Sequence, residues 1–262
     1  MFKYSLDNKR YHTLNYFYRT KFNSKVFKVP IDAHMSCPNK TNGNGCIYCS
    51  DFSKSNIINS NESIEEQFLN NIKILENKWP NSLYIPYFQA GTNTYAPLST
   101  LKKLFEGLLH YPKVVGLAIA TRPDTLSDEV IDYLGELNKK TFLTIELGLQ
   151  SSNNKTLEFI KRGHNVECFI NAVKKLKEKG IFVVAHIING LPNENDKDMI
   201  NTIKLLNDLK VDGIKIHMLF ITKNTELADI YEKEKFHILS KEEYINIVIK
   251  QLELLDEKIV IE

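Results

Sequence analysis

Three of the four cysteines of this chain lie close together in the stretch "IDAHMSCPNKTNGNGCIYCS", residues 31–50. Cys37, Cys46 and Cys49 have the spacing C-x8-C-x2-C in a loop rich in glycine and asparagine, whereas Cys168 stands alone. Three thiols are the wrong number for disulfides, and no signal peptide is recognisable before them. We therefore expect a cytoplasmic protein, in which clustered cysteines indicate metal or redox chemistry.

Two kinds of metal site fit these cysteines. With His34 just upstream, they could form the tetrahedral Cys3His set of a zinc site. The alternative is an iron–sulfur cluster held by three thiolates. A four-iron cluster usually takes four cysteines, so three would leave one iron open for a ligand that is not protein. The loop alone does not decide between the two.

The composition indicates one globular domain. The chain has 262 residues, of which 43% are hydrophobic and 25% charged, and this is enough to bury a core without disulfide or metal staples. No segment approaches the roughly 18 unbroken apolar residues of a membrane span, so we expect no membrane partner.

Short apolar runs alternate with longer amphipathic segments along the chain. Runs that are hydrophobic almost throughout predict parallel strands covered on both faces. Six strand–helix units predict a parallel α/β sheet, either a partial barrel or a doubly wound sheet. In both, chemistry belongs at the C-terminal ends of the strands. We expect strands at 26–33, 83–90, 114–121, 142–150, 182–190 and 213–220, and helices at 63–79, 99–111, 127–140, 166–180 and 196–210.

Polar residues gather in and after these strands, at the end where the cysteine loop also follows its strand. Each has a simple structural explanation when taken singly, such as a glycine turn or a loop closed before a proline. Those explanations do not account for polar groups at the same end of every strand, which indicates a site. The residues are Gly91, Thr92, Asn93, Thr94, Arg122, Glu146, Gln150, Arg162, His186, Lys215 and His217.

The ordered set of motifs resembles the radical S-adenosylmethionine enzymes. It comprises the three cysteines with Tyr48 between the last two, "GTNT" after the second strand, "ELGLQS" on the fourth and "GLP" after the fifth. The stretches "RYHTLNYFYRTKF", "ELGLQSSNNKTLEFIKRGH" and "DGIKIHML" are similar to the YhcC/YtqA (MnmL-like) branch, related to the radical domain of the elongator catalytic subunit. The similarity runs from about residue 10 to about residue 250.

This resemblance implies a partial (β/α)6 TIM-type barrel in which Cys37, Cys46 and Cys49 bind a [4Fe–4S] cluster. It also implies that the amino and carboxylate groups of S-adenosylmethionine chelate the open iron. One electron passed to the sulfonium would release a 5′-deoxyadenosyl radical, which takes a hydrogen atom from the substrate. An electron donor of the flavodoxin or ferredoxin type is the expected partner.

The remaining polar residues can be assigned roles on this basis. Guanidinium binds carboxylates through paired hydrogen bonds, which suits Arg162 to the methionine carboxylate. Lys215, His217 and Arg122 are the expected catalytic residues, of which Arg122 lies on the rim and could face either the cofactor or the substrate. The other expected contacts to the cofactor are Gly91, Thr92, Asn93 and Thr94 for the methionine amino group, Glu146, Gln150 and His186 for the ribose, and Tyr48 with the backbone of Gly190 and Leu191 for the adenine.

The substrate that the resemblance implies is tRNA, whose wobble 5-carboxymethylaminomethyluridine would become 5-aminomethyluridine. A small-molecule substrate and a non-catalytic zinc- or RNA-binding module are the alternatives. Residues 1–30 form a basic and aromatic segment ahead of a core domain at 31–262. Its basic groups and rings could contact phosphates and bases, or its aromatics could pack on the open edge of the barrel.

Two features depart from this branch. The loop between Cys37 and Cys46 is shorter than is usual there. The chain also ends at Glu262 after "KIVIE", which reads as a strand, whereas relatives continue further. A truncated chain, with the last edge of the barrel left open, is the corresponding expectation.

Overall fold

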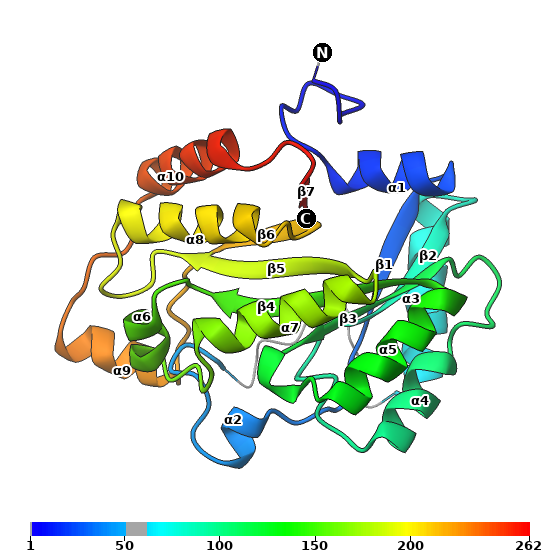
Figure 1. The fold of residues 1–262 in the computed structure, drawn as a ribbon, viewed down its shortest axis with the longest axis horizontal. Coiled ribbons are helices and arrows are strands. Elements are labelled where there is room, and N and C mark those ends of the chain that lie inside the picture. Colours follow the sequence, from blue (N-terminus) through cyan, green and yellow to red (C-terminus); the bar gives the residue numbers. More distant parts are fainter. Residues whose placement is uncertain (1, 51–61) are drawn as a thin grey trace.

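The computed structural model describes residues 2–50 and 62–262, and within them the chain forms one sheet of seven parallel strands in the order β1 to β7 (Figure 1). Neighbours in sequence are neighbours in the sheet throughout, as in a barrel. The partial barrel is therefore confirmed over the doubly wound alternative, whose strand order reverses. The strands are β1 (Val26–Ile31), β2 (Leu83–Phe88), β3 (Gly116–Thr121), β4 (Phe142–Gln150), β5 (Phe182–Asn189), β6 (Gly213–Met218) and β7 (Val260–Ile261).

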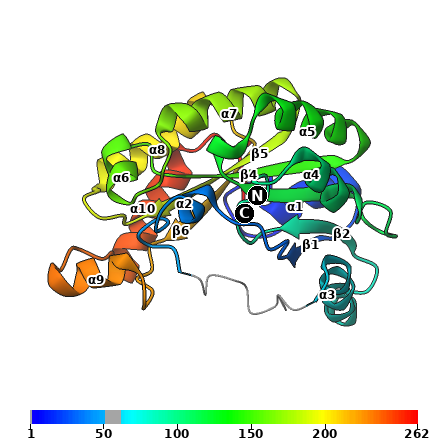
Figure 2. The same ribbon diagram turned by 90° about the horizontal axis from the view of Figure 1, so that it is seen from below.

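The sheet curls into a half-barrel with helices such as α5 and α7 on its outside (Figure 2). Ser63 and Ser127 cap two of these helices, because their side chains accept hydrogen bonds from the backbone amides of Glu66 and Val130. The helices are α1 (Leu14–Phe22), α2 (Pro38–Thr41), α3 (Ile64–Lys78), α4 (Leu98–Glu106), α5 (Asp128–Lys140), α6 (Asn154–Phe159), α7 (Val166–Glu178), α8 (Asp196–Asp208), α9 (Glu226–Lys233) and α10 (Lys241–Leu254).

The two faces of the sheet have different side chains. Since successive residues of a strand point to opposite faces, Ile214 and Ile216 of β6 face the outer helices while Lys215 and His217 face the interior. The outward side chains and the helices form the main hydrophobic core. The interior of the half-barrel is polar at the level of Lys215 and apolar towards the start of the strands.

Helix α1 fills that apolar end. Tyr18 is 3% exposed and packs on the interior side chains Val26, Ile85 and Tyr87. The ring of Phe17 lies 4.8 Å from that of Phe182, at the start of β5. In Figure 1, α1 and α2 lie at opposite ends of the strands. Aromatic residues of the N-terminal segment thus pack against the barrel, and β1 itself begins within the range 1–30.

The sequence "KIVIE" extends the sheet by the short strand β7, which pairs with β6 through Val260 and Gly213. Ile261 also forms a bridge to Thr13, just before α1. Strand β7 therefore has backbone partners on both sides, β6 on one and Thr13 on the other. Among the helices described, none is long and apolar enough to cross a membrane.

Candidate functional site

A cavity of about 530 Å³ opens at the C-terminal ends of the strands. Its wall combines the cysteine loop, the loop after β2 and the polar interior of β3 to β6. The sequence-predicted residues that line it are Cys37, Cys46, Cys49, Tyr48, Gly91, Thr92, Arg122, Glu146, Gln150, Arg162, His186, Lys215 and His217.

The cysteine loop is shaped by the short helix α2. The carbonyl of Cys37 accepts hydrogen bonds from the amides of Lys40 and Thr41, and the hydroxyl of Thr41 donates to the same carbonyl at 3.1 Å. The amide of Cys49 donates to the carbonyl of Cys46 at 3.0 Å. These turns bring the three thiols to one wall of the cavity although up to 12 positions separate them in sequence.

Cys46 is the most enclosed of the three thiols and is 7% exposed. Its sulfur receives hydrogen bonds from Asn39 Nδ2 at 3.3 Å and from Arg162 Nη1 at 3.7 Å. Burial raises the pKa of Cys37, but the hydrogen bond with Thr92, the amide of Asn39 and the charge of Arg122 outweigh it, so that the pKa falls below its ordinary value. The surroundings therefore favour the thiolate of Cys37, whereas burial raises the pKa of Cys49 above its ordinary value.

Two glycines allow the loops to approach one another closely. Gly91 has φ of +78°, and a Cβ there would lie 2.2 Å from the carbonyl oxygen of Met35 in the cysteine loop. At Gly148 a Cβ would lie 2.5 Å from Arg162 Nη2, which donates to the Gly148 carbonyl at 2.8 Å. A side chain at either position would push the cysteine loop or Arg162 out of place.

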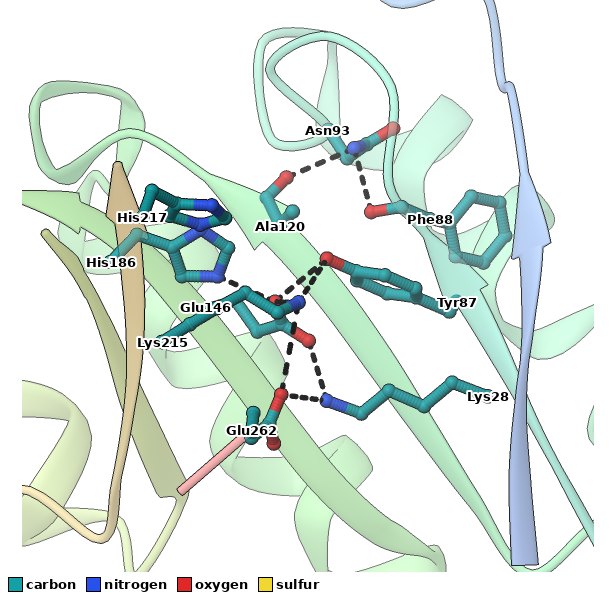
Figure 3. Close-up of polar contacts among 10 residues, drawn as sticks. All are labelled: Lys28, Tyr87, Phe88, Asn93, Ala120, Glu146, His186, Lys215, His217 and Glu262. Atoms are coloured by element: carbon teal, nitrogen blue, oxygen red, sulfur yellow. Dashed lines mark hydrogen bonds and ion pairs between the residues drawn. The ribbon is translucent and has the colours of Figure 1, made fainter. Parts of the chain in front are cut away.

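Beneath the cavity, a buried network converges on the carboxylate of Glu146 (Figure 3). This side chain is fully buried and receives Lys28 Nζ at 2.7 Å, the hydroxyl of Tyr87 at 2.7 Å, His186 Nε2 at 2.6 Å and Lys215 Nζ at 3.2 Å. Each donor comes from a different strand. A carboxylate in the interior of the sheet is thereby neutralised by cations and hydrogen-bonded on both oxygens.

This network fixes the charge of its members. Burial raises the pKa of Glu146, but the charge of Lys28, the hydrogen bond from His186 and the charge of Lys215 prevail and hold the pKa well below its ordinary value. Burial and the neighbouring Glu146 carboxylate raise the pKa of Tyr87 well above its ordinary value. At neutral pH the network consequently contains an ionised Glu146 and a neutral phenol.

Two arginines near the thiols each keep an unused donor. Arg122 donates to both carboxylate oxygens of Asp124 and to the carbonyl of Arg162, yet its buried Nη1 has no partner among the described residues. The same holds for the buried Nε of Arg162. Both side chains line the cavity, so the site has spare cationic donors beside the thiols, as a bound carboxylate would require.

Four of the predicted residues do not line the cavity. Asn93 is fully buried, and its Nδ2 ties the end of β2 to that of β3 by donating to the carbonyls of Phe88 and Ala120 (Figure 3). The hydroxyl of Thr94 is bonded to those of Thr121 and Thr125. The other two are Gly190, which turns with φ of +84°, and Leu191, which packs in an apolar cluster with Ile47.

Three residues of the buried network were not among those predicted from the sequence. Lys28 and Tyr87 lie in the middle of apolar strands, and Glu262 lies after β7, with its carboxylate bonded to Lys28. A lysine within the apolar run "VFKVPI" is a signal that sequence reasoning could have used, since Lys is almost never buried unless it is paired. Cys168, the cysteine that stands alone in the sequence, is half-buried on α7.

The surroundings of the thiols bear on the two metal hypotheses. In residues 2–50 and 62–262, no group of three or more His, Cys, Asp and Glu side chains is placed to hold a single metal ion. A zinc ion needs all its ligands about 2.0–2.3 Å from one point. A four-iron cluster is larger and binds each thiolate through a different iron. Three thiols that share a cavity wall, beside unused arginine donors, fit such a cluster with an open iron and a carboxylate-bearing ligand.

Comparisons with known protein families agree with this site. Residues 37–206 match the model of the radical SAM superfamily, and residues 211–262 match that of the Radical_SAM C-terminal domain. The first match begins at Cys37 and contains the expected cluster cysteines together with most of the residues that line the cavity.

Similar curated proteins cover nearly the whole chain. The protein YtqA of Bacillus subtilis (strain 168) is 44% identical over 99% of this chain and 82% of its own length. Protein YhcC of Escherichia coli (strain K12) is 32% identical over 86% of this chain and 73% of its own length. The solved structure of Elp3 from Methanocaldococcus infernus superposes with a TM-score of 0.66 at 22% identity, and it is matched over 91% of this chain and 56% of its own.

Proposed function

We propose that this chain, which belongs to the radical S-adenosylmethionine superfamily, modifies the wobble uridine of tRNA. In this proposal, 5-carboxymethylaminomethyluridine is converted to 5-aminomethyluridine. The observation that carries it is a cavity in which three thiols and two arginines face a buried, cation-rich network, in a chain whose relatives include enzymes of tRNA uridine.

Enzymes of this superfamily use a [4Fe–4S] cluster and S-adenosylmethionine, and the pair supplies the one-electron chemistry that removes a hydrogen atom from carbon. The chain is accordingly an enzyme, and a non-catalytic zinc module is set aside. Cys37, Cys46 and Cys49 would hold the cluster. The unused donors of Arg122 and Arg162 would receive the methionine carboxylate.

The choice of substrate is supported by two relatives. A protein named tRNA uridine(34) acetyltransferase from Methanocaldococcus jannaschii is 34% identical over 154 residues, which are 58% of this chain and 28% of its own length. Elongator complex protein 3 of Saccharomyces cerevisiae is 27% identical over 54% of this chain. Since only part of each relative is matched, their names direct the proposal towards RNA without defining the reaction.

The reaction can be written with its atoms and electrons in balance. A hydrogen atom leaves the carbon between the secondary amine and the carboxylate. The resulting carbon radical loses one electron to an oxidised carrier of the ferredoxin or flavodoxin class and one proton from nitrogen, which gives an imine. Water then adds to the C=N bond and breaks the C–N bond, releasing glyoxylate and leaving the aminomethyl group on the base.

The interior cations suit this substrate. Lys215 Nζ reaches the cavity wall and lies 3.4 Å from the hydroxyl of Tyr87, with 23% of the lysine side chain exposed. The carboxylate of the modified uridine would pair with Lys215, while the uracil would lie across the mouth. A ferredoxin- or flavodoxin-type electron donor and a cytoplasmic location belong to the same proposal.

The test is mass spectrometry of tRNA nucleosides from a strain of the source organism that lacks this gene. We expect 5-carboxymethylaminomethyluridine to accumulate, and the gene to restore the wild-type profile while its Cys46→Ala variant does not. An unchanged wobble nucleoside would refute the wobble assignment. In addition, purified enzyme supplied with S-adenosylmethionine should release glyoxylate when the substrate tRNA is present and none when it is left out.

A small-molecule substrate predicts a different response. In that case the formation of 5′-deoxyadenosine by the anaerobic enzyme would be accelerated by a metabolite and not by tRNA carrying the carboxymethylaminomethyl group. We expect the tRNA to accelerate it, and tRNA from a strain unable to make that group to serve as the inactive control.

A further inference from the structure

The buried network under the cavity contains a chain of two histidines that ends on Glu146 (Figure 3). His186 Nε2 lies 2.6 Å from a carboxylate oxygen of Glu146, and His217 Nε2 lies 3.4 Å from His186 Nδ1. The three residues come from β4, β5 and β6, and the register pairs His186 with Lys215 and Ile188 with His217. His217 is the member nearest the mouth of the cavity and the most exposed of the three.

These contacts determine which ring nitrogens carry protons. An ionised carboxylate can only accept, so the proton between Glu146 and His186 lies on His186 Nε2. In the neutral ring, Nδ1 of His186 is then an acceptor, and the proton on the next contact lies on His217 Nε2. His217, which lines the cavity, is thereby left with its lone pair on Nδ1.

The proposed substrate needs such a base. Its secondary amine is flanked by a carboxymethyl group, and even the α-amino group of a peptide, which has no free carboxylate beside it, has a pKa of about 8, so the nitrogen arrives mainly protonated. Removal of a hydrogen atom from the neighbouring carbon is helped by a nitrogen lone pair that shares the unpaired electron. A protonated nitrogen has no lone pair to share, so the proton must leave first.

We infer that His217 accepts this proton on Nδ1, and that His186 and Glu146 act as positioning residues that fix its tautomer. The inference rests on the proposed function. The step is a proton transfer alone: the N–H bond of the substrate ammonium breaks and an N–H bond forms on His217. Nothing is oxidised or reduced. The positive charge on His217 is then linked through His186 to the carboxylate of Glu146.

The surroundings keep the His217 ring neutral before the substrate binds. Burial, His186 and Lys215 lower its pKa to about 4, so that at neutral pH only one of its two ring nitrogens carries a proton. The groups that act on it are the ring of His186, the cation Lys215 and the carboxylate of Glu146. The other charged or titratable members of the network are Lys28, Glu262 and Tyr87, which contact Glu146 or one another. A substrate carboxylate paired with Lys215 would oppose that lysine's charge and raise the affinity of His217 for the proton.

The first test needs neither cofactor nor substrate. Nitrogen NMR of protein carrying labelled histidine, assigned with the H186Q and H217N variants, reports the tautomer of each ring. At pH 7 we expect His217 to be neutral and both rings to carry a proton on Nε2. In the H186Q variant, His217 should populate both tautomers. If His186 is protonated on Nδ1, or if either ring is doubly protonated, the proposed chain of hydrogen bonds from His217 through His186 to Glu146 is wrong.

The second test is the pH profile of tRNA modification by the complete enzyme. We expect H217N to lose activity by about 100-fold or more and to lose the acid limb of the kcat profile, because general base catalysis is typically worth 10²–10⁴-fold. H186Q should retain the acid limb at a shifted pH. H110N, at an exposed histidine outside the site, is the matched control.

The outcomes separate the two proposals. Iron content and melting temperature of H217N should equal those of wild type, so that a loss of activity cannot be attributed to misfolding. Activity of H217N within a few-fold of wild type, or an unchanged acid limb, would overturn the base assignment. If the wild-type enzyme leaves the modified tRNA unchanged, the proposed function is wrong instead. The tautomers measured by NMR would then still show whether His186 and Glu146 fix the proton on His217 Nε2.

Discussion

Cys46 is enclosed by Asn39 and Arg162, and its replacement tests the cluster directly. We expect Cys46→Ala to lose the [4Fe–4S] cluster, because two remaining thiolates can hardly retain it. Iron and sulfide content and electron paramagnetic resonance of anaerobic protein provide the measurement. Cys168→Ala, which removes a half-buried thiol on α7, should keep a full cluster. Equal iron content in the two variants would contradict the assignment of the cysteines.

The guanidinium of Arg162 donates to the sulfur of Cys46 and should affect the reduction potential of the cluster. Hydrogen bonds to cluster sulfurs and nearby positive charge favour the reduced state. Arg162→Gln is therefore expected to lower the potential, on the order of 50 mV for the loss of one charged donor. Arg162→Lys keeps the charge, so its reduction potential should lie between those of the wild type and the Gln variant. A redox titration followed by electron paramagnetic resonance decides it, and a raised potential in the Gln variant would exclude this role.

At the scale of elements, the contact between the cysteine loop and the loop after β2 depends on Gly91. We expect Gly91→Ala to destabilise the protein and reduce its iron content, because the new Cβ meets the Met35 carbonyl at 2.2 Å. Gly180→Ala is the matched control: its φ of +69° is also positive, but its Cβ would meet nothing closer than 3.9 Å. The control should lose only the roughly 1–2 kcal/mol of a left-handed residue and keep its iron. Equal effects on melting temperature and iron would show that the close approach is unimportant.

At the scale of the whole molecule, Lys28 joins distant parts of the half-barrel. It starts on β1 and pairs with Glu146 on β4 and with Glu262 after β7, where its own side chain is 12% exposed. Lys28→Met leaves buried carboxylates with fewer cations and should reduce the free energy of unfolding by about 3–5 kcal/mol. The measurement is urea unfolding under anaerobic conditions. Lys113→Met, which breaks an exposed pair with Glu76, should be indistinguishable from wild type.

Acid should weaken the fold through its buried histidines. Burial and then the charge of Arg162 lower the pKa of His164 to about 4, below its ordinary value of 6.5. As the pH falls from 6.5 to 4, the unfolded chain takes up a proton that the folded chain does not, so stability is lost across that window. His164→Asn should flatten the dependence of unfolding free energy on pH. An unchanged slope would mean that other groups cause the acid sensitivity.

The sequence by itself determined the strands, their order and the five helices α3, α4, α5, α7 and α8, whereas α6, α9 and α10 were not among the helices that it predicted. Runs that are hydrophobic almost throughout are a local property and identified the strands, and alternation within "GIKIHMLF" places Lys215 and His217 on one face. The caps at Ser63 and Ser127 were equally local. The cofactors and the cluster cysteines followed from motifs that keep their order and spacing along the chain.

Only the tertiary structure decided which interior side chains meet. Lys28 and Glu146 are 118 positions apart, and nothing local to either predicts that the curl of the sheet brings them within 2.7 Å. The same curl makes Glu146 and His186, predicted as ribose contacts, members of a buried network with Tyr87, while both still line the cavity. It also commits Asn93 to joining two strand ends. Pattern identifies the face of a strand, but partners across a barrel depend on its radius and register, which are set by the packing of the whole chain.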